Sequence, residues 1–109
     1  MEKYKLRFFF EYGGIGDCLW SSNDVAYRKF GFGSLDLEDL PLSNDLKAIL
    51  YDMSEEYQSS LDWNYPPDPS PWSEEHKEDF LIRSKQVYQR LVSELDDDFE
   101  VQYCVEKYN

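Results

Sequence analysis

Residues 4–12 read YKLRFFFEY, and the side chains of these nine residues alternate in character along the chain with a period of two. One face carries only apolar and aromatic residues: Tyr4, Leu6, Phe8, Phe10 and Tyr12. The other face carries three charged residues and one aromatic residue: Lys5, Arg7, Phe9 and Glu11. Successive side chains of a strand point to opposite sides of the sheet, so the stretch predicts a half-buried β-strand.

A glycine-rich run follows this strand. Residues 13–17 read GGIGD, which favours a turn, and residues 18–20 can return as a short antiparallel partner of the first strand. The run lacks the glycine spacing of dinucleotide-binding and phosphate-binding loops. It therefore predicts a hairpin turn and no nucleotide site.

The alternation returns near the other end of the sequence. Its apolar set is Phe99, Val101, Tyr103 and Val105. Glu100 falls on the opposite face, where it can lie across from Lys5 or Arg7, and opposite charges on neighbouring strands are mildly stabilising. We therefore place this last strand beside the first one and expect a small antiparallel sheet made of the N-terminal hairpin and the C-terminal strand.

Three helices are predicted between these strands. A short one spans residues 24–30, with Ser22 or Asn23 as its cap and Gly31 as its stop. The second begins after Ser43 and keeps helical spacing over Leu46, Ile49, Leu50, Met53, Tyr57 and Leu61. The third begins either with Ser70 as cap and Pro71 at the first helical position, or with Ser73 as cap. Its buried stripe would be Phe80, Val87, Leu91 and Leu95.

These elements predict one α+β domain over residues 1–109, with the sheet packed against two long helices and one short helix. A chain of 109 residues can bury a core without metals or disulfides. Its two cysteines, Cys18 and Cys104, are expected as free thiols, although a bridge is possible if they lie close together. No segment reads as a signal peptide or a membrane span, so we expect a cytoplasmic protein.

The formal charge of −12 is concentrated in the middle of the sequence. Residues 34–79 hold 13 acidic and 2 basic side chains, whereas residues 1–33 hold 4 and 5, and residues 80–109 hold 6 and 4. A negative field of this size repels phosphate backbones and anionic lipids. This charge argues against direct binding to nucleic acid or to an anionic membrane. It favours a basic protein as partner.

No catalytic or metal-binding group of residues stands out. Cys18 has one base of the usual kind, His76, but this lies on the far side of two predicted elements, and nearby acids raise a thiol pKa and lower its reactivity. The acids of residues 96–98 lack the spacing of a calcium-binding loop and predict a solvated turn. We therefore expect no enzyme activity, no cofactor and no metal, with a small cysteine-dependent enzyme as the less favoured alternative.

Residues 61–72 read LDWNYPPDPSPW, and their prolines favour a stiff, extended connection between the second and third helices. One interpretation is that Trp63, Tyr65 and Trp72 fold back as a lid on the core. The other is that they form an ordered contact surface, since tyrosine and tryptophan are common interface anchors. A proline-rich ligand for an SH3-type groove fits poorly, because the flanking residues are acidic and aromatic.

The second helix carries acids opposite its apolar stripe. Ordinary solvation can explain such a face, but the excess of acid continues on both sides of the helix, so a docking face for a basic partner is an equal alternative. The residues predicted to bind a partner are Asp45, Asp52, Glu55, Glu56, Asp62, Trp63, Tyr65, Asp68, Trp72 and Glu75.

Three strings carry a family resemblance: DCLWSSND at residues 17–24, LPLS at 40–43 and WNYPPDPSPW at 63–72. They resemble those of a family of small bacterial proteins of no assigned activity. Size, acidity and the absence of a catalytic motif also make the chain similar to immunity proteins of contact-dependent inhibition and other polymorphic toxin systems. This resemblance implies stoichiometric binding and neutralisation of a cognate toxin domain, often a basic nuclease. The alternative is an acidic adaptor or subunit of another complex.

Overall fold

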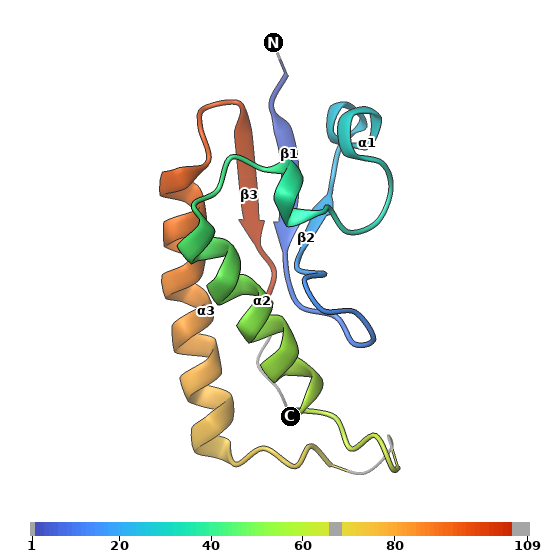
Figure 1. The fold of residues 1–109 in the computed structure, drawn as a ribbon, viewed down its shortest axis with the longest axis vertical. Coiled ribbons are helices and arrows are strands. Elements are labelled where there is room, and N and C mark those ends of the chain that lie inside the picture. The colour runs from blue at the N-terminus through green and yellow to red at the C-terminus, as the bar shows by residue number, and fades with distance from the viewer. Residues whose placement is uncertain (1, 66–68, 106–109) are drawn as a thin grey trace.

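The computed structural model describes residues 2–65 and 69–105 and shows an α+β fold, as the sequence predicts (Figure 1). The elements in chain order are β1 (Tyr4–Phe8), β2 (Leu19–Ser21), α1 (Asp24–Phe30), the short 3₁₀ helix η1 (Leu37–Asp39), α2 (Asn44–Gln58), α3 (Glu74–Glu94) and β3 (Phe99–Tyr103). The strands form one sheet in the order β2-β1-β3, which places the last strand beside the first.

The direction of β3 corrects the expected sheet. β2 pairs with β1 in the antiparallel sense, but β3 runs parallel to β1, with Tyr4 opposite Phe99 and Phe8 opposite Tyr103. The sheet is therefore mixed. A period-two pattern is the same whichever way a strand runs, so it fixes which face is buried and leaves the direction open. The direction follows from α3, because a tight turn after the helix sends the chain back alongside it (Figure 1).

The charged face of the first strand behaves as predicted. Lys5 lies opposite Glu100 in the sheet register, and its Nζ is 3.9 Å from a carboxylate oxygen of Glu100. On the same face, the rings of Phe9 and Trp20 stack with centroids 4.9 Å apart. This face of the sheet is the one turned away from the core.

The core lies between the sheet and the long helices. α2 crosses in front of the sheet, and α3 flanks it on the β3 side (Figure 1). The largest fully buried side chains come from all of these layers: Leu6, Phe8, Leu19, Leu37, Leu46, Leu50, Phe80 and Leu91. Apart from Leu61, the stripes predicted for the second and third helices thus face one shared interior.

Side-chain caps set the starts of the helices. Asn23, Ser43 and Ser73 accept hydrogen bonds from the backbone N–H groups of Ala26, Leu46 and His76, each at 3.1 Å. The third helix therefore takes the second of its two predicted starts. α2 ends at Gln58, earlier than the predicted apolar stripe, which extends to Leu61. Serine hydroxyls compete with helical hydrogen bonds there, since those of Ser59 and Ser60 donate back to backbone carbonyls at 2.6 and 2.7 Å.

The glycine-rich turn is fastened to α2. The Ser54 hydroxyl accepts from the Gly16 N–H at 2.8 Å, and the Gln58 side chain accepts from the Gly13 N–H at 2.8 Å. Gly16 has a φ of 90°, and a Cβ on it would lie 2.6 Å from the ring of Tyr51. Glycine is required at this position both for its backbone conformation and for its close approach to α2.

Candidate partner-binding surface

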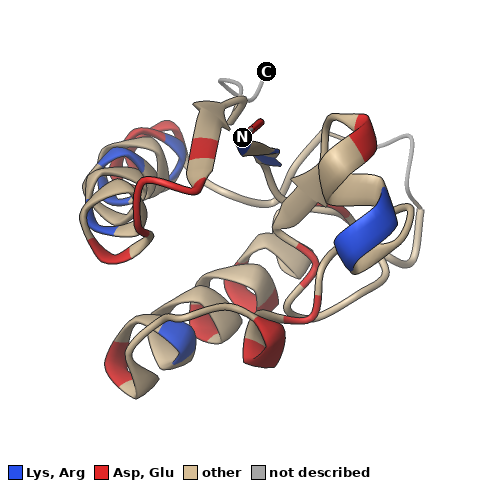
Figure 2. Cartoon of the chain, turned by 90° about the horizontal axis from the view of Figure 1, so that it is seen from above, with Lys and Arg blue, Asp and Glu red and all other residues tan. Residues whose placement is uncertain are grey.

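Acidic residues gather on α2 and on the segment that leads into it, whereas α3 carries both acidic and basic residues (Figure 2). We call the exposed members of this group the acidic surface: Asp36, Glu38, Asp39, Asp45, Asp52 and Glu55. Lys47 is close enough to neutralise one of them, with its Nζ 3.0 Å from Glu38. These six carboxylates therefore lie together on α2 and the segment before it, while α3 and the turn after it carry further acids of their own.

Two of the predicted contact residues have basic partners within the protein. Oδ2 of Asp45 lies 2.7 Å from Nη2 of Arg90 in α3. Glu56 accepts two hydrogen bonds from the guanidinium of Arg83, one of them at 2.8 Å, and a further one at 2.8 Å joins it to His76 Nε2. These two acids connect α2 to α3. Among the residues that the structure describes, no ion pair involves Asp52 or Glu55, so their charges face solvent.

The surroundings of Glu56 change its acidity. The hydrogen bond from Arg83 lowers the pKa of the Glu56 carboxyl, and the contact with His76 lowers it further, although partial burial opposes both. The same carboxylate raises the pKa of the Arg83 guanidinium, and Asp79 adds to this at 2.7 Å. The helical spacing of the acids did not reveal this network, because it depends on how α3 lies beside α2.

The aromatic residues of the connection divide between the two interpretations. Trp72 is 7% exposed, stacks on His76 with ring centroids 3.9 Å apart, and donates from Nε1 to Ser59 Oγ at 2.8 Å. It closes the core, which corrects its prediction as a surface anchor. Trp63 and Tyr65 are 56% and 59% exposed. Their exposure agrees with the second interpretation, in which these rings form a contact surface.

The exposed aromatics are held in place by the loop. Trp63 donates from Nε1 to the Gln58 carbonyl at 2.6 Å, and its ring meets that of Tyr12 edge-on with centroids 6.1 Å apart. Asp62 accepts from the backbone N–H groups of Asn64 and Tyr65 at 3.0 and 3.2 Å. Its carboxylate therefore shapes the turn that presents these rings.

Two further predicted contact residues lie outside this group. Glu75 is exposed in the first turn of α3. Asp68 lies outside the described residues, as do Pro66 and Pro67.

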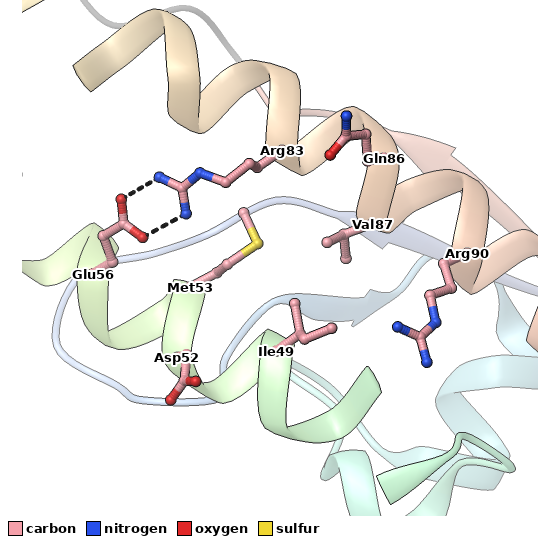
Figure 3. Close-up of a pocket in the computed structure, with 8 residues that line it drawn as sticks. All are labelled: Ile49, Asp52, Met53, Glu56, Arg83, Gln86, Val87 and Arg90. Carbon is pink, nitrogen blue, oxygen red and sulfur yellow. Dashed lines mark hydrogen bonds and ion pairs between the residues drawn. The ribbon is translucent and has the colours of Figure 1, made fainter. Parts of the chain in front are cut away.

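An apolar groove that the sequence did not predict separates α2 from α3 (Figure 3). Its volume is about 360 Å³, and its floor is made by Ile49, Met53 and Val87. Arg83 and Arg90 line its two ends, and each forms an ion pair with an acid of α2. Asp52, Glu56 and Gln86 complete the lining.

A family comparison identifies the chain. A sequence model described as "Serratia CdiI immunity protein-like" matches residues 4–106, which is nearly the whole sequence. The chain belongs to this immunity protein family. A search of curated proteins found no match.

Membership of the Serratia CdiI immunity protein-like family confirms the resemblance to proteins of contact-dependent inhibition. It supports a role in immunity and implies a cognate toxin as partner. It also favours a non-enzymatic role. In the described part of this immunity protein, no helix is both long and apolar enough to cross a bilayer.

The cysteine-enzyme alternative finds no support in the surroundings of the two residues it requires. Cys18 of the immunity protein is completely buried, and this burial, with a smaller effect of Asp17, raises the pKa of its thiol to about 12. His76 instead contacts Glu56 and Trp72. Both Cys18 and Cys104 are free thiols, and across residues 2–65 and 69–105 no group of three or more His, Cys, Asp or Glu side chains could hold a metal ion.

We expect a thiol reagent at pH 7 to modify Cys104, which is partly exposed, while Cys18 reacts only after unfolding in denaturant. Mass spectrometry after timed labelling with 5,5′-dithiobis(2-nitrobenzoic acid) measures both sites. The Cys104→Ser variant is the control, because it leaves only the buried thiol. Rapid labelling of Cys18 in that folded variant would contradict the buried, protonated thiol and revive the enzyme alternative.

Proposed function

We propose that this immunity protein neutralises a cognate toxin domain by stoichiometric binding in the cytoplasm, and that the toxin domain is a basic nuclease. The observation that carries the proposal is the acidic surface on α2 and the segment before it, in a chain that belongs to an immunity family. Carboxylates arranged in this way offer a basic nuclease cleft the charge that nucleic-acid phosphates would otherwise supply.

The two parts of the surface contribute differently to binding. Asp52 and Glu55 attract the toxin over a distance and mainly raise the rate of association. Trp63 and Tyr65 bury apolar area on contact and mainly lower the rate of dissociation. Asp62 acts by shaping the loop that carries the two rings.

The remaining predicted contact residues have supporting parts in this proposal. Glu75 extends the negative field beyond α2, and Asp68, which lies outside the described residues, stays a predicted contact residue. Asp45 and Glu56 contribute through the pairing of α2 with α3, because both are bound to arginines of α3. Trp72 lies in the core and so anchors the segment between α2 and α3 to the rest of the fold.

Reversing the charge of the acidic surface should weaken toxin binding in a salt-dependent way. We expect the double variant Asp52→Lys/Glu55→Lys to associate with the toxin domain about tenfold more slowly at low ionic strength. The difference should shrink as salt screens the charges. Stopped-flow or surface plasmon resonance measurements against the toxin domain encoded beside the gene provide the rates.

The matched control is Asp97→Lys/Asp98→Lys, which changes the net charge equally but at the exposed turn between α3 and β3. It should retain most of the association rate. Equal rates for the α2 variant and the wild type at every salt concentration would remove the acidic surface from the binding site. Failure of the wild type to bind that toxin domain, or to rescue growth on co-expression, would overturn the proposed function.

A further inference from the structure

We propose that the groove between α2 and α3 receives an apolar side chain of the toxin, carried on a segment whose lysine or arginine reaches Asp52. This inference rests on the proposed function and names the anchor point of the same complex. Three properties of the groove fit it for this role: its apolar floor, the ion pairs at its ends and the charge at its rim.

The floor can bind an apolar group. Ile49 and Met53 from α2 and Val87 from α3 line a space of about 360 Å³ (Figure 3). This volume lies near the lower end of the range of about 300–1,000 Å³ typical of small-ligand pockets, so it suits one or two side chains. Methionine adapts its shape to an incoming group more easily than branched residues do.

Two cross-helix ion pairs hold the groove open. Figure 3 shows Arg83 reaching across to Glu56 at one end and Arg90 pointing toward α2 at the other. Arg90 binds Asp45 at 2.7 Å and also its helical neighbour Glu94 at 3.0 Å. Since each arginine is matched by at least one carboxylate, the ends of the groove carry little free positive charge, and the groove is already present in the chain without a partner. A preformed pocket lowers the ordering cost of binding.

The charge at the rim selects the occupant. Asp52 lines the groove, is exposed and has no basic partner in the ranges that the structure describes. It belongs to the acidic surface, so the groove is continuous with the face proposed to attract the toxin. An apolar side chain next to a cationic one satisfies both the floor and the rim. Another copy of this acidic chain matches them less well, because its charge of −12 would oppose the approach.

A variant that fills the groove tests the inference. Gln86 lines the groove and is exposed, so the change Gln86→Trp places an indole over the apolar floor without removing a core side chain. We expect the affinity for the catalytically inactivated toxin domain to fall at least tenfold, mainly through faster dissociation. The control is Gln89→Trp, which adds the same ring to an exposed position of α3 that does not line the groove. Thermal unfolding of both variants checks that they fold.

The possible outcomes separate the two proposals. If the wild type binds the toxin and Gln86→Trp binds equally well, the groove inference is overturned and the proposed function stands. If the wild type does not bind, the proposed function fails and the inference fails with it. If sedimentation shows a wild-type dimer that Gln86→Trp abolishes, a second copy occupies the groove and the toxin does not. Loss of toxin binding in Gln86→Trp alone supports the inference.

Discussion

Replacing Phe80 with alanine is expected to lower the free energy of unfolding by about 3–5 kcal/mol, because deletion of a buried ring removes its transfer free energy and leaves a cavity. Phe80 is fully buried in α3, with ring centroids 5.2 Å from Phe10 of the N-terminal segment and 5.1 Å from Trp72. The loss is large beside the total of about 5–15 kcal/mol typical of a domain. Urea denaturation followed by tryptophan fluorescence measures it.

The control for this prediction is Ile82→Ala, which lies two residues further along α3 and has a side chain that is 58% exposed. Surface substitutions of this kind usually change the free energy of unfolding by no more than about 0.5 kcal/mol. Similar losses in the two variants would contradict the placement of Phe80 at the centre of the core.

The second large effect is expected for Glu56→Gln, which should lower the free energy of unfolding by about 1–3 kcal/mol at pH 7, as is typical when a hydrogen bond to a charged group is lost. Arg83 and His76 both lose their carboxylate partner in this variant. Glu55→Gln is the matched control, because its neighbouring carboxylate is exposed. Urea denaturation at a series of pH values compares the three proteins.

The difference in stability between the wild type and Glu56→Gln should depend on pH in a definite direction. The folded protein holds the Glu56 pKa below the ordinary value of 4.5. The carboxylate therefore contributes its stabilisation in full above pH 4.5, and the contribution is lost as the pH falls through the folded pKa. The gap between the wild type and Glu56→Gln should be widest near neutrality and should narrow in acid. A gap that stays constant down to pH 3 would contradict the network.

The parts of the fold that could be predicted from the sequence depend on neighbours along the chain. Alternation at residues 4–12 and 99–105 identifies two strands, and Asn23 and Ser43 mark two helix starts, because each pattern acts within one element. The direction of β3 could not be predicted, since it depends on the path of the chain through three helices. The choice between Ser70 and Ser73 likewise required the structure.

For the candidate site, the sequence predicts the excess of acidic residues but not how they are arranged or paired. The excess of acid in residues 34–79 is visible in the sequence, and the structure places much of it together on α2 and the segment before it. The pairing of Glu56 with Arg83 is not visible, because the two residues meet only when α2 and α3 lie side by side. The same is true of the groove, whose floor comes from both helices. Trp63 and Trp72 look alike in sequence, and burial alone separates them.

The parallel pairing of the first and last strands has a consequence for how the molecule reaches its working form. Positions 4 and 99 must find each other before the central strand gains its second neighbour, and closing so long a stretch of chain is entropically slow. A newly synthesised chain stays incomplete until its final strand has left the ribosome. The three-stranded sheet is therefore expected to be among the last parts of the fold to form.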